Sequence, residues 1–104
     1  MGRSSMSIEN QGDIALCLFI EPYLEDFWMR PGEAFTVRSE RDGVGVLFET
    51  AVAKGCVTVW LYEDGDPSKF VADYAVVDAD GKPLESGHQR PPGQRWSAGG
   101  PIID

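Results

Sequence analysis

The chain has 104 residues, a hydrophobic content of 42% and a formal net charge of -8, with a single His and two Cys. This size and composition predict one small globular domain. Acidic residues outnumber basic ones by 17 to 9. This excess of negative charge would repel a phosphate backbone or an anionic membrane, so we expect neither nucleic acid nor membrane as a partner. One imidazole and two widely separated thiols exclude the zinc sites built from paired His or paired Cys, and we expect no cofactor and no metal.

The two ends of the chain are polar and carry no regular pattern. Residues 1–12 lack periodicity, and residues 90–104 include adjacent prolines and several glycines. We expect a flexible tail at each end and a single β domain over residues 13–89. Three large apolar residues of the C-terminal tail are candidates for docking on that domain: Trp96, Ile102 and Ile103.

The longest apolar run, residues 14–20, is too short for a membrane span and lacks the basic flank of a signal peptide. We therefore expect a cytoplasmic protein. In that compartment Cys17 and Cys56 are expected to be reduced, buried thiols.

Turn signals divide the predicted domain into short runs rich in Val, Phe, Trp and Tyr. In chain order, the predicted strands are residues 14–21, 34–38, 44–53, 56–62 and 70–77. Residues 22–30 are compatible with two helical turns, but we prefer a loop followed by a strand. Strands at about ten-residue spacing predict an all-β fold, a small antiparallel β-sandwich or partly open barrel of about six to seven strands.

Two turns can be predicted in more detail. In residues 30–33, Pro31 and Gly32 occupy the second and third positions that favour a type II turn, in which Gly32 has a positive φ. A two-residue loop at Lys54-Gly55 would fix the register of the hairpin around it. The predicted pairs are Ala53 with Cys56, Val52 with Val57, Thr50 with Val59, and Phe48 with Leu61.

That register separates the hairpin into two faces. The first is an apolar stripe, predicted to be core: Val46, Phe48, Thr50, Val52, Val57, Val59 and Leu61. The second carries Trp60 and Tyr62 beside Leu47, and is either a second buried layer or a surface used for binding. If the loop were one residue longer, the faces would swap on one strand.

A set of short motifs occurs in a fixed order along the chain. They are Glu21-Pro22, an aromatic residue (Trp28) ahead of Pro31-Gly32-Glu33, and a closing Gly87-His88-Gln89-Arg90. In this order the chain resembles a set of small uncharacterised bacterial proteins, over most of residues 20–90. The resemblance implies no activity. It implies that Glu21, Glu33, His88 and Arg90 belong together around one polar cluster.

Catalytic chemistry finds little support in the sequence. His88 is the single imidazole and hence the only conventional general base near neutral pH, with Glu21 or Glu33 as candidate partners. A Cys–His nucleophile pair is disfavoured because Cys17 and Cys56 lie inside predicted apolar strands, where a thiol is inert.

Three functions are therefore considered. The leading hypothesis is a non-catalytic module that contacts another protein, most simply a second copy of itself. The alternative is a small-molecule or glycan-binding domain with an aromatic cleft, and the third is an enzyme using His88. The candidate binding residues are Trp60, Tyr62, Leu47, Trp28 and Arg90, because Trp, Tyr and Arg are typical anchors of interfaces and ligand pockets.

Overall fold

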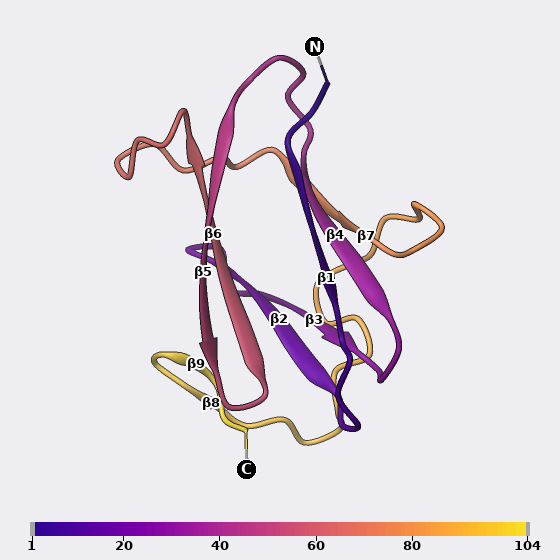
Figure 1. Ribbon diagram of the computed structural model, residues 1–104. Helices are drawn as coiled ribbons and strands as arrows, with labels where there is room; N and C mark the ends of the chain where they lie inside the picture. Colours follow the sequence, from indigo (N-terminus) through magenta and orange to yellow (C-terminus); the bar gives the residue numbers. More distant parts are fainter. Residues whose placement is uncertain (1, 104) are drawn as a thin grey trace.

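The computed structural model describes residues 2–103, and over that range the chain forms strands but no helix (Figure 1). In chain order these are β1 (Ser5–Glu9), β2 (Leu16–Glu21), β3 (Glu25–Met29), β4 (Ala34–Ser39), β5 (Val46–Ala53), β6 (Cys56–Glu63), β7 (Tyr74–Val77), β8 (Trp96–Ser97) and β9 (Gly100–Pro101). The predicted all-β class is confirmed. The described residues hold nine strands, more than predicted, because β1, β8 and β9 lie in the segments expected to be tails.

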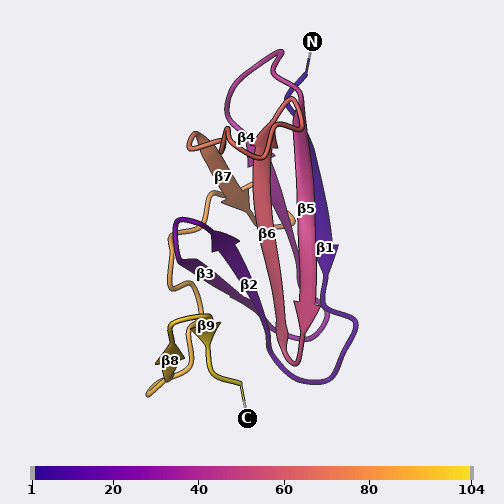
Figure 2. The same cartoon turned by 90° about the vertical axis from the view of Figure 1, so that its left-hand side faces the viewer.

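Two open sheets form a sandwich, and a short hairpin flanks one of them (Figures 1 and 2). One sheet has the order β1-β4-β7, the other the order β3-β2-β6-β5, and β8 pairs with β9. All pairs are antiparallel except β2 with β6, which run parallel. The arrangement is therefore a mostly antiparallel sandwich with free sheet edges and not a closed barrel.

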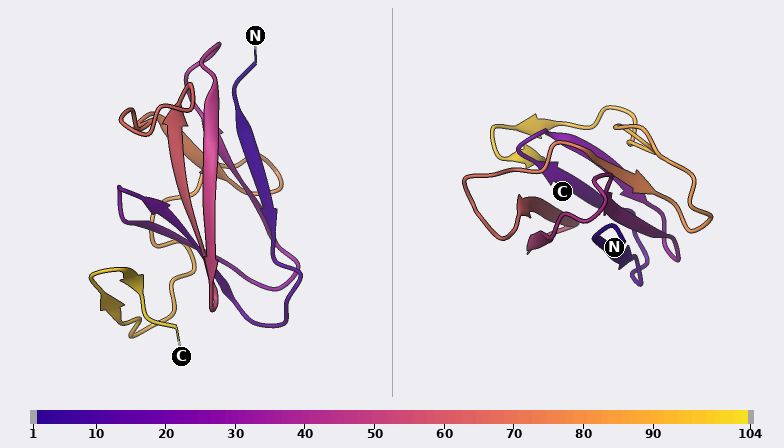
Figure 3. Two further views of the ribbon diagram at one scale, coloured as in Figure 1. Left: turned by 60° about the vertical axis from the view of Figure 1, so that its left-hand side comes forward. Right: turned by 90° about the horizontal axis from the view of Figure 1, so that it is seen from above.

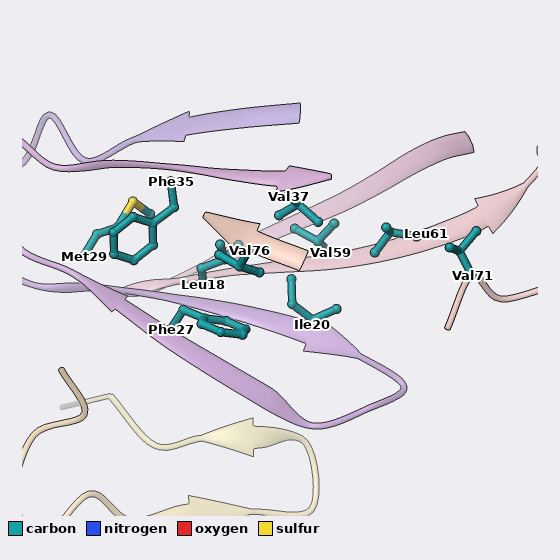
Figure 4. Packing of buried hydrophobic residues seen from close by; sticks show 10 residues of the cluster. All are labelled: Leu18, Ile20, Phe27, Met29, Phe35, Val37, Val59, Leu61, Val71 and Val76. Atoms are coloured by element: carbon teal, nitrogen blue, oxygen red, sulfur yellow. The ribbon is translucent and has the colours of Figure 1, made fainter. Parts of the chain in front are cut away.

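The core lies between the two sheets. Strand alternation turns every second side chain of β2, β3, β4 and β6 inward, so that apolar residues of both sheets meet (Figure 4). This central cluster consists of Leu18, Ile20, Phe27, Met29, Phe35, Val37, Val59, Leu61, Val71 and Val76. Residues 22–30 contribute Phe27 and Met29 from β3, which confirms a loop followed by a strand.

The N-terminal segment is not a free tail. Strand β1 pairs with β4 over residues 5–9. Beyond the strand, the buried side-chain amide of Asn10 donates hydrogen bonds to the carbonyls of Ile14 (2.9 Å) and Met29 (3.0 Å). The strand does alternate: Met6 and Ile8 pack against the core, whereas Ser5, Ser7 and Glu9 are exposed, and this short alternation was overlooked in the sequence.

The C-terminal segment also folds back. Its hairpin, β8–β9, lies against the β2–β3 side of the four-stranded sheet, on the face turned away from the other sheet (Figures 2 and 3). Ile103 packs onto a second apolar cluster, called here the outer cluster: Cys17, Phe19, Trp28 and Cys56. Of the three candidate docking residues, Ile103 packs on this cluster, and Trp96 lies 6.2 Å from Phe19 between ring centroids but stays 42% exposed. Met1 and Asp104, the outermost residues of the predicted tails, lie outside the described range.

The β5–β6 hairpin has the predicted register, with Ala53 opposite Cys56 and Phe48 opposite Leu61. Its predicted core face is only partly buried. Val59 and Leu61 lie in the core, whereas Val52 is 78% exposed. The difference arises because β5 is an edge strand, and its C-terminal half extends past the apolar cover that buries β6.

The predicted turn at residues 30–33 is present. Glu33 N–H donates to the Arg30 carbonyl at 3.0 Å, and Gly32 has a φ of 85°. A Cβ added at Gly32 would meet nothing within 4 Å. Only backbone conformation, and not crowding, therefore favours glycine at this position.

We expect Gly32→Val to lower the free energy of unfolding by about 1–3 kcal/mol, the cost of a strained backbone site. Gly32→Asn should cost less, because asparagine tolerates the left-handed region. Urea denaturation of both variants checks this. Equal stability of the Val variant and the wild type would contradict the account of the turn.

Candidate functional site

A buried ion pair lies under the C-terminal segment. Phe27 and Met29 point into the core, so Asp26 and Trp28 of β3 face the opposite side. Asp26 is fully buried, and Arg90 holds it with two hydrogen bonds, Nε to Oδ2 at 2.7 Å and Nη2 to Oδ1 at 2.6 Å. Trp28 Nε1 donates to Oδ2 at 2.9 Å. The carboxylate therefore connects β3 to the segment that follows His88.

This arrangement keeps Asp26 ionised. Burial alone would raise the pKa of its carboxyl, but the hydrogen bonds from Arg90 and Trp28 outweigh it and hold that pKa below the ordinary value. The same pairing raises the pKa of Arg90. A carboxylate held in this way is a poor proton donor or acceptor near neutral pH.

A hollow of about 400 Å3 opens beside the ion pair, between the β2–β3 hairpin and the C-terminal hairpin. It is lined by Phe19, Leu24, Asp26, Arg90, Trp96, Ser97, Ala98 and Gly100. The Arg90 guanidinium lies over the Trp96 ring, 5.4 Å from its centre. Nε and Nη2 of Arg90 donate to Asp26, whereas Nη1 makes no hydrogen bond within residues 2–103. The hollow thus combines aromatic walls with a cationic donor.

The predicted polar cluster does not form as one group. Arg90 pairs with Asp26, and Glu21 lies at the end of β2 opposite Trp60. Among these four residues, Glu33 and His88 lie close enough for the imidazole of His88 to help lower the pKa of the Glu33 carboxyl. Within residues 2–103, no hydrogen bond or ion pair joins Glu21 to Glu33, His88 or Arg90.

His88 serves the structure mainly through its backbone and its ring face. Its carbonyl accepts a hydrogen bond from Trp28 N–H at 2.9 Å, and its ring packs edge-on against Phe35 with centroids 5.6 Å apart. Within the described range, the imidazole donates to neither Glu21 nor Glu33. No hydrogen bond in this range therefore supports the pairing of His88 with Glu21 or Glu33.

The two candidate glutamates are themselves held differently. Burial would raise the pKa of Glu33, but hydrogen bonds from the Gln89 side chain (2.8 Å) and the Arg30 N–H (2.7 Å) lower it below the ordinary value. Glu33 therefore acts as a cap on its own turn. Burial raises the pKa of Glu21.

The aromatic residues of the predicted binding face are divided among separate surroundings. Trp28 is buried in the outer cluster. Trp60 is half-buried, and Tyr62 is half-buried against Phe70, with ring centroids 5.3 Å apart. Leu47 remains exposed on the neighbouring edge strand. The face predicted to be either a buried layer or a binding surface is therefore only partly covered within residues 2–103.

What stays open is the outer edge of β5. Strand β6 lies between β2 and β5. On the side away from β5, Cys17 N–H of β2 donates to the Gly55 carbonyl, and Val71 N–H donates to the Leu61 carbonyl. The odd-numbered residues of β6 therefore direct their backbone groups away from β5. The even-numbered residues of β6 therefore bond to β5, and the register pairs them with odd-numbered residues of that strand.

The even-numbered residues of β5 consequently direct their N–H and C=O groups outward: Val46, Phe48, Thr50 and Val52. No backbone hydrogen bond within residues 2–103 joins these groups to another segment. Such a row of unpaired groups is a template for adding a strand. Sequence reasoning had located the hairpin faces but not this edge, since strand order depends on contacts far apart in the chain.

Searches of protein-family models, of curated proteins and of solved structures each find no match for this chain. No helix over residues 2–103 is long and apolar enough to cross a membrane. In the same range, no three His, Cys, Asp or Glu side chains are grouped so as to hold a metal ion. The case for a function therefore depends on the β5 edge and the hollow beside Arg90.

Proposed function

We propose that the protein is a non-catalytic module that contacts a second copy of itself by pairing β5 with β5 across a twofold axis. The observation that carries the proposal is the contrast between β5 and the other sheet edges. Strand β5 has eight residues, lacks proline and carries a single charge, Glu49. Native proteins usually blunt such an edge with charge, proline or a covering segment.

Two of the other edges are covered by the chain. Residues 87–88 lie along β3, where Gly87 N–H donates to the Asp26 carbonyl and Trp28 N–H to that of His88. Along β7, Leu84 N–H donates to the Val76 carbonyl and Asp78 N–H to that of Lys82. The edge strand β1 is shorter, and alternate residues on it are polar. Strand β5 is the long edge without comparable protection.

Antiparallel pairing of two β5 strands has one register that suits both backbone and side chains. Residues that face each other must lie on the same side of the sheet, and the outward groups belong to even-numbered residues. Centring the pair on Thr50 places Thr50 opposite its copy, where the two hydroxyls can hydrogen-bond. It also places Phe48 opposite Val52 of the second copy, which would cover the exposed Val52.

The same register separates the negative charges. With Thr50 at the centre, Glu49 lies opposite Ala51 of the second copy. A shift that centres the pair on Glu49 would set two carboxylates directly opposite, which is destabilising. Charge therefore favours the Thr50-centred pair and an isologous dimer with one continuous eight-stranded sheet.

Sedimentation velocity over a dilution series tests the proposal. A single edge pairing buries little surface, so we expect a dimer that dissociates on dilution. The sedimenting mass should rise from that of the 11.4 kDa chain toward twice that value. A monomer at every concentration up to the millimolar range would overturn the proposal.

The hollow beside Arg90 favours a second function, binding of a small aromatic anion. Its walls include the Phe19 and Trp96 rings, and the unused Nη1 of Arg90 could bind a carboxylate. We expect 2-naphthoate to change Trp96 fluorescence in the wild type. Ala98→Leu, which fills the hollow without touching the ion pair, should abolish the response, and an equal response in both proteins would contradict this function.

A further inference from the structure

We propose that Cys17 and Cys56 form a reversible disulfide, a modification site that opens when the C-terminal segment lifts from the sheet. The two cysteines are direct partners in the parallel pairing of β2 with β6. Both face the outer side of the sheet, where they belong to the outer cluster beneath Ile103. This proposal does not depend on the self-association of β5.

The strand pairing places the Cα atoms of the two cysteines at a spacing found in disulfides. Neighbouring strands lie about 4.8 Å apart, inside the 4.4–6.8 Å spacing of Cα atoms in disulfides. The Cβ atoms of such a pair point the same way, about as far apart as the Cα atoms, which is beyond the usual Cβ spacing in a disulfide. The bond would therefore be strained and easily reduced, as in labile regulatory disulfides.

The environment also makes the two sulfurs unequal. The Cys17 thiol hydrogen-bonds to Cys56 and, with a weaker contribution from Thr58, lowers the pKa of Cys56 to about 7 against the effect of burial. The same interaction, together with burial, raises the pKa of Cys17. Cys56 is thus the thiolate that attacks first, and Cys17 the thiol that resolves.

The chemistry requires a small disulfide as oxidant. The Cys56 thiolate attacks one of its sulfurs, the reagent S–S bond breaks, and the departing thiolate takes up a proton. Cys17 then loses its proton and attacks the Cys56 sulfur of the mixed disulfide, which releases the second reagent thiol. Two cysteine thiols are oxidised, and one reagent disulfide is reduced to two thiols.

Access to the sulfurs depends on the last residues of the chain. Cys17 is fully buried and Cys56 is 8% exposed, so a reagent cannot reach either while Ile103 is in place. Ile103 is seated closely: a Cβ on Gly55 would lie 2.5 Å from its Cγ2. Its neighbour Ile102 is not part of the outer cluster and provides a matched control.

The test uses the full chain treated with oxidised glutathione under native conditions, followed by intact mass and peptide mapping. We expect a loss of two hydrogens, a Cys17–Cys56 peptide pair, and full reversal by dithiothreitol. Ile103→Ala should accelerate the reaction at least about tenfold over Ile102→Ala, because removing the cover lowers the cost of opening. Cys17→Ser should instead retain one glutathione on Cys56.

Circular dichroism of each variant before treatment establishes that it is folded. Stable glutathione adducts on both cysteines of the wild type, or disulfides only between chains, would overturn the proposed bond. Equal rates for Ile103→Ala and Ile102→Ala would overturn the role of the C-terminal segment, as would a wild-type rate equal to that of global unfolding.

Discussion

Replacing Arg90 with Met is expected to lower the free energy of unfolding by about 3 kcal/mol at neutral pH. The variant keeps most of the side-chain volume but leaves the buried Asp26 carboxylate without its cation and without two of its hydrogen bonds. The remaining side-chain donors are Trp28 Nε1 at 2.9 Å and, more weakly, the Ser86 hydroxyl at 3.5 Å. We place the effect at the low end of the range for buried ion pairs because the Arg90 side chain is 44% exposed.

Urea denaturation measures this effect, with Arg41→Met as the matched control. Arg41 pairs with Glu63 at 3.1 Å, but both side chains are accessible to solvent, so its loss should cost less than about 1 kcal/mol. Adding Asp26→Asn to Arg90→Met should recover part of the lost stability, since the unpaired charge is then removed. Equal effects at Arg90 and Arg41 would show that the buried pair contributes no more than an exposed one.

The same pair predicts a pH dependence with a definite sign. The folded-state pKa of Asp26 is lowered, so its stabilisation is complete above the unfolded-state value of about 3.9 and is lost as the pH falls through the folded-state value. The wild type should therefore lose stability below about pH 4. The stability difference between the wild type and Arg90→Met should narrow as the pH falls, because Asp26 becomes protonated in the variant at a higher pH than in the wild type.

The second large effect is expected on association. Thr50→Pro removes the N–H that points out of the β5 edge, and it removes no hydrogen bond to β6, because that N–H has no partner within residues 2–103. Two such groups are lost in a dimer centred on Thr50. At about 1 kcal/mol for each bond, the dissociation constant should rise at least about 30-fold, as measured by sedimentation equilibrium.

Two matched variants separate this effect from a general loss of structure. Thr50→Val keeps the N–H and the strand preference, so its dissociation constant should stay within a few-fold of the wild type. Ala51→Pro removes an N–H that bonds to β6 and should lower the free energy of unfolding by about 3 kcal/mol, whereas Thr50→Pro should cost less than 1 kcal/mol. Unchanged dimerisation of Thr50→Pro would exclude the β5 edge as the interface.

Local chemistry explains which parts of this fold were predictable. The turn at residues 30–33 and the register around Lys54-Gly55 depend on residues next to each other, and both agree with the structure. Strand β1 and the C-terminal hairpin were missed because each is stabilised by distant partners. Asn10 binds the Met29 carbonyl, and Ile103 packs on Cys17 and Cys56.

The candidate site was harder to predict for the same reason. Asp26 and Arg90 are separated by 64 positions, and their pairing depends on the path of the C-terminal segment. One signal was available: Asp26 is an acidic residue within a run that is otherwise rich in large apolar residues, and such a carboxylate usually has a cationic partner. Strand order, which leaves β5 at an edge, has no comparable signal in the sequence.

Amide hydrogen exchange along β5, measured at two protein concentrations, tests the central claim most directly. The account predicts that the amides of Phe48, Thr50 and Val52 exchange slowly in concentrated, dimeric protein and quickly after dilution. The amides of Leu47, Glu49 and Ala51, which bond to β6, should be protected at both concentrations. Rapid exchange at Phe48, Thr50 and Val52 under conditions where sedimentation gives a dimer would contradict pairing through this edge.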